Sequence, residues 1–189
     1  MAASGFVLAG GRSRRMGRDK ALLPYRGRVL VEHVAGIVRE ALGASAEIAI
    51  LGDPECYRDL GYPVHPDQIP NCGPLGGIVT ALNLTKSEWN LVVACDMPML
   101  AASNLRMLVE RARESQAQCV AASGPVGELE PLCAVYHRRC LAALDRALRD
   151  KRLKMKDLLS ELQPEPVAFP PAALANVNTP EDWTQFQPR

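Results

Sequence analysis

The chain has 189 residues, of which 48% are hydrophobic and 23% are charged, and its formal net charge is +1. This composition is typical of a globular protein with a sizeable core, and it excludes a mainly disordered chain. The near-neutral charge excludes a global positive field for nucleic acid or an anionic membrane. Any phosphate binding must therefore come from local placement of cations. The length predicts a single domain over residues 1–189.

The first residues, MAASGFVLAGGRSRR, place a short apolar run before the arginines, whereas a secretory signal places its charge first. No window approaches the roughly 18 apolar residues of a membrane-spanning helix. The six cysteines include no CxxC pair, and several stand in apolar runs such as LVVAC. We therefore expect reduced, buried thiols in a cytoplasmic protein. The three histidines are far apart, which argues against a zinc site.

Short apolar runs alternate with helical patterns along the chain. Strands are predicted at Phe6–Leu8, Glu47–Leu51, Leu91–Ala94, Cys119–Ala122 and Leu132–Tyr136. Helices are predicted at Val29–Leu42, Gly76–Leu84, Ser103–Arg113 and Arg138–Asp150. A last short helix is predicted with Thr179 as its N-cap and Pro180 at its first position. The stretches Gly124–Pro131 and Gln163–Pro171 are predicted to be loops. The alternation predicts an α/β fold, a three-layer sandwich around a Rossmann-like, mostly parallel sheet.

The first predicted strand runs directly into a glycine- and arginine-rich segment, LAGGRSRRMGRDK. Gly10 and Gly11 have no Cβ atom, so backbone N–H groups there can approach a phosphate chain. Five cations within nine residues can neutralise a triphosphate, namely Arg12, Arg14, Arg15, Arg18 and Lys20. The segment contains neither GxxxxGK[ST] nor GxGxxG, so it is not a P-loop and a dinucleotide fingerprint is unsupported. We interpret it as a phosphate-binding loop rather than a merely solvated one.

A second feature is the run LVVACDMP, in which a predicted buried strand ends in Asp96 and a proline follows. A carboxylate at the end of a central strand is suited to holding Mg²⁺ between phosphate groups. Mg²⁺ prefers hard oxygen ligands and keeps several waters, so one carboxylate plus phosphates can suffice. The alternative is an acidic cap on the next turn. We predict that Asp96 binds Mg²⁺ as a cofactor.

The segment LAGGRSRRMGRDK resembles the signature loop of nucleotidyltransferases that use a nucleoside triphosphate and release pyrophosphate. Within that group the chain is most similar to the molybdenum cofactor guanylyltransferases, which attach GMP to molybdopterin. The runs DQIPNCGPLGG, CDMP and NVNTPED extend the resemblance over most of the chain. It implies a fold of the nucleotide-diphospho-sugar transferase type. It also implies GTP, molybdopterin or the molybdenum cofactor, and other proteins of cofactor biosynthesis as partners, with no nucleic acid or membrane.

The resemblance also implies roles for individual residues. Nucleotide contacts fall on Leu8, Ala9, Gly10, Gly11, Lys20, Asp67, Gly73, Pro74, Leu75 and Asp96. The implied catalytic residues are Arg15, Lys20 and Asp96, with the first two on the triphosphate. The implied substrate residues are Asn176, Asn178, Lys154 and Lys156. The paired asparagines alternate along an extended segment, so both side chains face one side. The lysines belong to a basic stretch toward the acceptor, although a solvated helix face would need no function.

Two departures from the family pattern concern the substrates. Some members carry an asparagine just after the second strand, where this chain reads Leu51-Gly52-Asp53, and the stretch GELEP is a loose match.

The guanine-type runs LAGG and GPLGG favour GTP. The open alternatives are a related transferase using CTP with molybdopterin, one using another nucleotide with a sugar phosphate, and a non-catalytic nucleotide-binding protein. Pyrophosphate release under turnover conditions separates a transferase from a binder.

Overall fold

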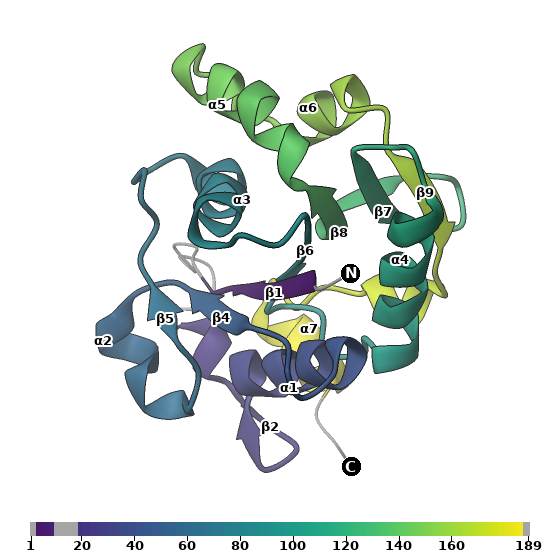
Figure 1. Ribbon diagram of the computed structural model, residues 1–189. Helices are drawn as coiled ribbons and strands as arrows, with labels where there is room; N and C mark the ends of the chain where they lie inside the picture. Colours follow the sequence, from purple (N-terminus) through teal and green to yellow (C-terminus); the bar gives the residue numbers. More distant parts are fainter. Residues whose placement is uncertain (1–2, 10–18, 187–189) are drawn as a thin grey trace.

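The computed structural model describes residues 3–9 and 19–186, and its centre is one seven-stranded sheet (Figure 1). The strand order is β5-β4-β1-β6-β8-β7-β9. The strands are β1 Ala3–Leu8, β4 Ile48–Leu51, β5 Val64–His65, β6 Trp89–Ala94, β7 Cys119–Ser123, β8 Leu129–His137 and β9 Glu165–Ala168. All neighbours pair in parallel except β8, which is antiparallel to β6 and β7. The predicted mostly parallel sheet is confirmed.

Helices cover both faces of this sheet, which makes the three layers that the sequence predicts (Figure 1). One face carries α1 Leu30–Leu42 and α4 Ala102–Glu114, and the other carries α3 Gly73–Leu84, α5 Leu141–Arg149 and α6 Met155–Glu161. The remaining helices are α2 Pro54–Tyr57, α7 Pro180–Phe186 and the short turns η1 Lys20–Leu22, η2 Arg58–Leu60, η3 Arg138–Cys140 and η4 Pro171–Leu174. A small hairpin joins β2 Pro24–Tyr25 to β3 Arg28–Val29. Among the helices of the described ranges, none is long and apolar enough to cross a membrane.

Side chains of the central strands alternate between two core clusters, one on each face of the sheet. On β1, Val7 joins the cluster under α1 and α4, whereas Phe6 and Leu8 join the cluster under α3, α5 and α6. Both faces are thus buried, which is why the run Leu91–Ala94 is apolar throughout rather than alternating. The parallel register pairs Leu8 with Leu51 and with Ala94, so β1, β4 and β6 end together at one edge of the sheet.

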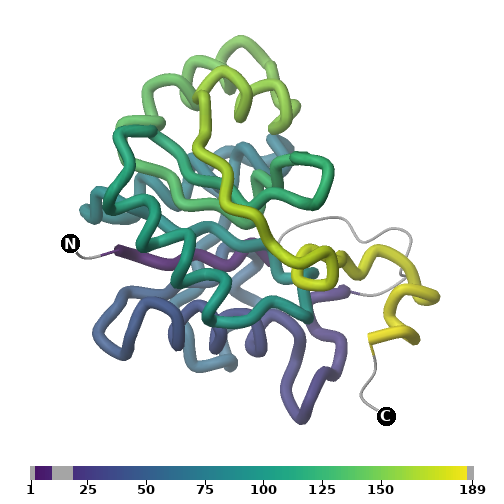
Figure 2. Tube along the Cα trace, turned by 90° about the vertical axis from the view of Figure 1, so that its right-hand side faces the viewer, coloured from purple at the N-terminus to yellow at the C-terminus, as the bar shows by residue number. Residues whose placement is uncertain are grey.

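The C-terminal segment returns to the part of the chain near residue 20 (Figure 2). Val177 and Trp183 are buried with Leu23, Tyr25 and Leu30 in a third, smaller cluster. The Val177 N–H donates to the backbone carbonyl of Asp96 at 2.8 Å. Residues far apart in sequence therefore meet beside the end of β6.

Both predicted loops contain strand residues, so these two predictions are wrong. The stretch Gln163–Pro171 contains β9, an edge strand, and Pro166 is tolerated there because an edge residue has no second neighbour to bond. The stretch Gly124–Pro131 contains the start of β8, which pairs with β7 beyond a bulge at Ala121 and Ala122.

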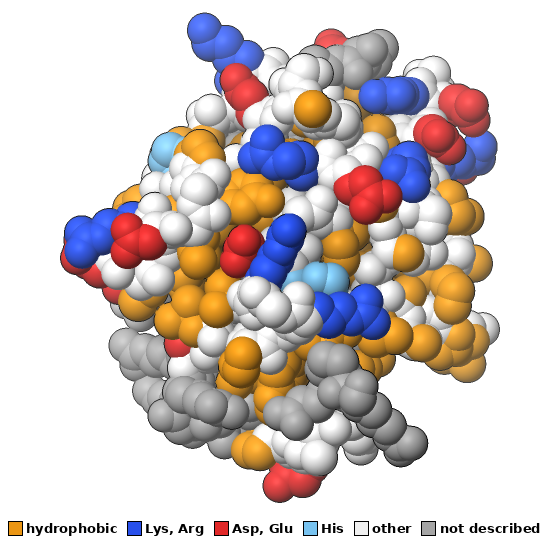
Figure 3. All heavy atoms as spheres, turned by 90° about the horizontal axis from the view of Figure 1, so that it is seen from below, with side chains coloured by type: hydrophobic (Ala, Val, Ile, Leu, Met, Phe, Trp, Pro, Cys, Tyr) orange, Lys and Arg blue, Asp and Glu red, His pale blue; other side chains and the backbone are white. Residues whose placement is uncertain are grey.

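All six cysteines lie among the described residues and are free thiols. Four are buried, as predicted, but Cys56 is exposed and Cys72 is partly exposed. On the face drawn in Figure 3, basic and acidic side chains are interspersed and separated by apolar ones. That face therefore carries no continuous field of one sign among its described residues.

Candidate active site

A cavity of about 500 Å³ opens at the carboxyl edge of the parallel part of the sheet. Its walls include Leu8, Leu51 and Ala94, which are the last residues of β1, β4 and β6. The other lining residues are Lys20, Asp67, Asn71, Gly73, Pro74, Gly77, Cys95, Asp96 and Leu132. Open α/β sheets bind ligands at this edge, and the volume suits a small molecule of nucleotide size.

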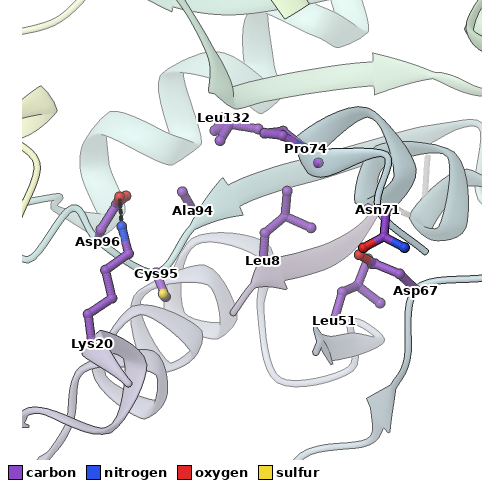
Figure 4. A pocket seen from close by; sticks show the side chains of 12 residues that line it. Leu8, Lys20, Leu51, Asp67, Asn71, Pro74, Ala94, Cys95, Asp96 and Leu132 are labelled. Atoms are coloured by element: carbon purple, nitrogen blue, oxygen red, sulfur yellow. Dashed lines mark hydrogen bonds and ion pairs between the residues drawn. The ribbon is translucent and has the colours of Figure 1, made fainter. Parts of the chain in front are cut away.

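The charged side chains occupy opposite ends of this cavity (Figure 4). Lys20 and Asp96 meet at one end, whereas Asp67 and Asn71 lie together at the other. Leu8 stands between the two ends and presents an apolar surface. The cavity thus has the Lys20–Asp96 ion pair at one end, Asp67 and Asn71 at the other, and an apolar surface between them. This arrangement suits an elongated ligand whose two ends differ in chemistry.

Lys20 and Asp96 form an ion pair in which Nζ and Oδ2 are 2.5 Å apart. The two side chains are 21% and 14% exposed, so water screens their attraction less than it screens a surface pair. Lys20 begins η1, and the Asp19 carboxylate caps this turn by accepting from the Ala21 N–H. Lys20 Nζ also donates to Asn178 Oδ1 at 3.4 Å. The structure therefore brings three predicted site residues, from three distant segments, into contact.

The second carboxylate oxygen of Asp96, Oδ1, is buried and has no hydrogen-bond partner among the described residues. The same is true of Oδ1 of Asn176, which precedes the residue bonded to the Asp96 backbone. A buried oxygen without a partner is costly unless it binds something. The described residues contain no cluster of three or more His, Cys, Asp and Glu side chains that could enclose a metal. An unpartnered carboxylate oxygen on a residue that lines the cavity fits Mg²⁺, which takes few protein ligands and keeps several waters.

Asp67 and the start of α3 form the opposite end of the cavity. Loss of water on its pocket side raises the pKa of the Asp67 carboxyl, although the residue as a whole is exposed. Asn71 and Gly73 have φ angles of 63° and 57°, and these left-handed residues turn the chain into the helix. A Cβ atom at Gly77 would lie 2.9 Å from Leu8 Cδ2 and 3.6 Å from Asp67 Oδ1. Glycine there lets α3 approach the cavity floor.

The predicted site residues fall into four groups. Those that line the cavity are Leu8, Lys20, Asp67, Gly73, Pro74 and Asp96. Those beside it are Ala9, Asn176 and Asn178. Leu75 is fully buried in the core under α3, and Lys154 and Lys156 are exposed at the start of α6, so none of these three lines the cavity. Gly10, Gly11, Arg12, Arg14, Arg15 and Arg18 lie outside the described residues.

Sequence reasoning did not single out several lining residues. Four of them could have been predicted from their position in the sequence. These are Leu51, Ala94 and Cys95, at the ends of strands, and Gly77, at the end of the GPLGG run. Leu132 reaches the cavity from β8, an antiparallel strand whose place in the sheet no local pattern indicates. Asn71 is a turn residue by type, and its place on the wall depends on the whole fold.

Comparison with known proteins decides the family. Residues 5–167 match the family described as the MobA-like NTP transferase domain. This chain belongs to that family. A probable molybdenum cofactor guanylyltransferase of Pelotomaculum thermopropionicum is 39% identical, with 95% of this chain and 89% of the relative covered. A molybdenum cofactor guanylyltransferase of Xanthomonas euvesicatoria pv. vesicatoria is 35% identical, with 97% and 93% covered.

The solved structures agree with this family at the level of the fold. A molybdopterin-guanine dinucleotide biosynthesis protein A from Archaeoglobus fulgidus has a TM-score of 0.79 at 22% identity. The match covers 97% of this chain and 96% of that one. The family that the sequence resembles is therefore confirmed, and the fold agrees with it.

Proposed function

We propose that this chain transfers GMP from GTP to the terminal phosphate of molybdopterin or the molybdenum cofactor and releases pyrophosphate. One observation carries the proposal: a single cavity holds the Lys20–Asp96 pair at one end and Asp67 at the other. The separation of these charged ends suits a nucleoside triphosphate lying across Leu8. The names of the relatives, which span nearly the whole chain, support guanylyl transfer among the possible reactions.

At the phosphate end, Lys20 supplies a positive charge that neutralises the triphosphate and the charge that develops on the leaving pyrophosphate. When bound at Asp96 Oδ1, Mg²⁺ would supply further charge neutralisation and orient the phosphates. The acceptor is a phosphate monoester and already an anion, so little general-base help is needed. Catalysis by these residues is then mostly positioning and electrostatics. Asp96 has a second role, since its Oδ2 holds the Lys20 ammonium in place.

At the other end, the Asp67 carboxylate is suited to guanine. An ionised carboxylate accepts hydrogen bonds at two oxygens, which match the N1–H and N2–H donors on one edge of guanine. The Asn71 side chain beside it can donate its amide N–H groups to an acceptor on the base. Cytosine lacks the paired donors, so this end supports GTP over CTP. A cytidylyltransferase remains the alternative that the same cavity could serve with a different base contact.

On the acceptor side, Asn176 and Asn178 are the nearest predicted residues. Their segment is held against Asp96 by the Val177 N–H, so an acceptor phosphate there would stand close to the Lys20 ammonium. We propose that Lys154 and Lys156 attract the anionic acceptor at longer range, since they stand outside the cavity wall. We also propose a cytoplasmic location, because six free thiols suit a reducing compartment.

The test is calorimetric binding of GTP, CTP, ATP, UTP and dTTP, each with and without Mg²⁺. We expect selective binding of GTP that strengthens when Mg²⁺ is present. Preference for CTP would replace the substrate while keeping the reaction class. If no nucleotide binds even after the acceptor has been added first, the proposed function is wrong.

A further inference from the structure

Tyr57 is a buried polar residue that the proposed mechanism does not use. It belongs to α2, the four-residue helix that follows β4, and its side chain is only 3% exposed. Its ring lies over Gly52, where a Cβ atom would come within 2.6 Å of Tyr57 Cε2 and 3.3 Å of Ala9 Cβ. Gly52 therefore leaves the space that lets the Tyr57 ring reach the end of β1.

The Tyr57 hydroxyl joins two points of the chain that are ten residues apart. Its oxygen lies 2.9 Å from the Ala9 carbonyl oxygen and 2.5 Å from Asp19 Oδ2, and the two acceptors share its single proton, with the shorter contact to the carboxylate. Burial and the Asp19 carboxylate raise the pKa of Tyr57, so the phenol keeps its proton and remains a donor. Ala9 is itself fixed, because its N–H donates to the Leu51 carbonyl at 2.8 Å.

Asp19 links the Tyr57 hydroxyl to the segment that contains Lys20. While Oδ2 accepts from Tyr57, Oδ1 accepts from the Ala21 N–H at 2.9 Å and caps η1. Lys20 is the first residue of η1 and comes directly after Asp19. Its ammonium reaches Asp96 Oδ2, at the end of a strand that pairs with β1. The two carboxylates therefore hold Lys20 from both ends, one through the backbone and one through the side chain.

We propose that the Tyr57 hydroxyl is a positioning group for Lys20. By holding Asp19 against the end of β1, it sets the start of η1 and so directs the Lys20 ammonium toward Asp96 and the triphosphate. Tyr57 itself touches neither substrate. The part that concerns the triphosphate rests on the proposed function, whereas the part that concerns Lys20 and Asp96 holds for the free protein.

The alternative is that Tyr57 has only a structural role, through packing of its ring in the core. Its ring does pack in the cluster under α1 and α4, so loss of the whole side chain would disturb that face. The Tyr57→Phe variant removes only the hydroxyl and keeps the ring. Tyr136→Phe is a matched control, because Tyr136 is also buried and its hydroxyl donates to a backbone carbonyl, that of Pro131, at 2.8 Å.

The first readout needs no nucleotide. Trace acylation with acetic anhydride, followed by peptide mass spectrometry, measures the reactivity of Lys20 relative to the exposed Lys86 in the same molecule. We expect roughly tenfold faster labelling of Lys20 in Tyr57→Phe, the factor that corresponds to loss of one hydrogen bond to a charged group, and no change in Tyr136→Phe. If Tyr57→Phe does not fold, Asp19→Asn removes the same charged acceptor and should give the same increase. Equal Lys20 labelling in the wild type and the folded variants would overturn the proposal.

The second readout is kinetic and includes Lys20→Ala. We expect Tyr57→Phe to lower kcat/KM for GTP roughly tenfold to a hundredfold in the wild-type background, and to change it little once Lys20 is gone. An equal loss in both backgrounds would mean that Tyr57 acts on packing and not through Lys20. If the wild-type protein itself releases no pyrophosphate, the proposed function fails, and the labelling experiment still decides the role of Tyr57.

Discussion

Replacing Asp96 with alanine is the perturbation that separates catalysis from folding most clearly. The substitution removes one partner of the Lys20–Asp96 pair, which is 2.5 Å long and mostly buried. Loss of one partner costs about 1 kcal/mol in an exposed pair and about 3–5 kcal/mol in a fully buried one, so an intermediate value of about 2–3 kcal/mol applies here. The same substitution removes Oδ1, a buried oxygen without a partner among the described residues, which relieves about 1–3 kcal/mol.

The two effects nearly cancel in the folding free energy. We expect Asp96→Ala to change stability by no more than about 2 kcal/mol, which for a chain of this size is a melting shift of roughly 4–8 °C. A domain with about 5–15 kcal/mol of stability stays folded after that loss. Turnover, by contrast, loses the metal ligand and the group that holds Lys20. A single preorganised electrostatic contact is worth about 10²–10³ in kcat, so we expect a loss of at least that size.

The assay is pyrophosphate release from GTP with freshly prepared molybdopterin, run beside thermal unfolding with and without Mg²⁺. Asp59→Ala, which removes an exposed carboxylate on η2, is the control and should keep wild-type turnover. We also expect any Mg²⁺-dependent rise in the melting temperature of the GTP complex to disappear in Asp96→Ala. Wild-type turnover in the folded Asp96→Ala protein would refute both the metal assignment and the pairing argument.

Three further predictions concern the base, the core and the acceptor. Burial raises the pKa of Asp67, so GTP affinity should fall as the pH drops through that raised value. The folded state should gain stability over the same pH range, because it binds the proton more tightly than the unfolded chain does. The Asp67→Asn variant should lose both pH effects and bind GTP roughly tenfold more weakly by calorimetry. Gly5→Ala should cost about 1–3 kcal/mol in denaturant unfolding, because its Cβ would lie 2.4 Å from Val38 Cγ1. Alanine at both Lys154 and Lys156 should raise the KM for molybdopterin several-fold and leave the KM for GTP unchanged.

Each of these predictions has a result that contradicts it. An Asp67→Asn protein that binds GTP as tightly as the wild type would remove Asp67 from the base contact. The Val38→Ala substitution should offset part of the Gly5→Ala penalty, and strictly additive effects would show that the predicted overlap is not the cause. An unchanged KM for molybdopterin would leave the two lysines as a solvated helix surface.

The sequence indicates the parts of the fold that depend on local pattern. The run Leu91–Ala94 is apolar because β6 is buried on both faces, and that burial is visible without a structure. Asp96 was predicted from its place at the end of this strand, and the structure pairs it with Lys20. The edge strand β9 was missed because Pro166 argues against a strand, and only its place at the edge of the sheet makes it acceptable.

The rest of the site depends on contacts between distant segments. No local sequence pattern indicates that the Val177 N–H donates to the Asp96 carbonyl, or that the Tyr57 hydroxyl donates to Asp19. The sequence departs from the family pattern after the second strand, where some members carry an asparagine and this chain reads Leu51-Gly52-Asp53. In the structure, Gly52 in this segment leaves room for the Tyr57 ring, which the sequence pattern did not indicate.

The central claim is that one cavity binds GTP and passes its GMP to molybdopterin. The most direct measurement is mass spectrometry of the products formed from purified protein, Mg²⁺, molybdopterin and an equimolar mixture of GTP and CTP, with pyrophosphate counted in parallel. We predict molybdopterin guanine dinucleotide as the main product, with one pyrophosphate released per dinucleotide. A cytosine dinucleotide as the main product, or no dinucleotide while GTP remains bound, would contradict the claim.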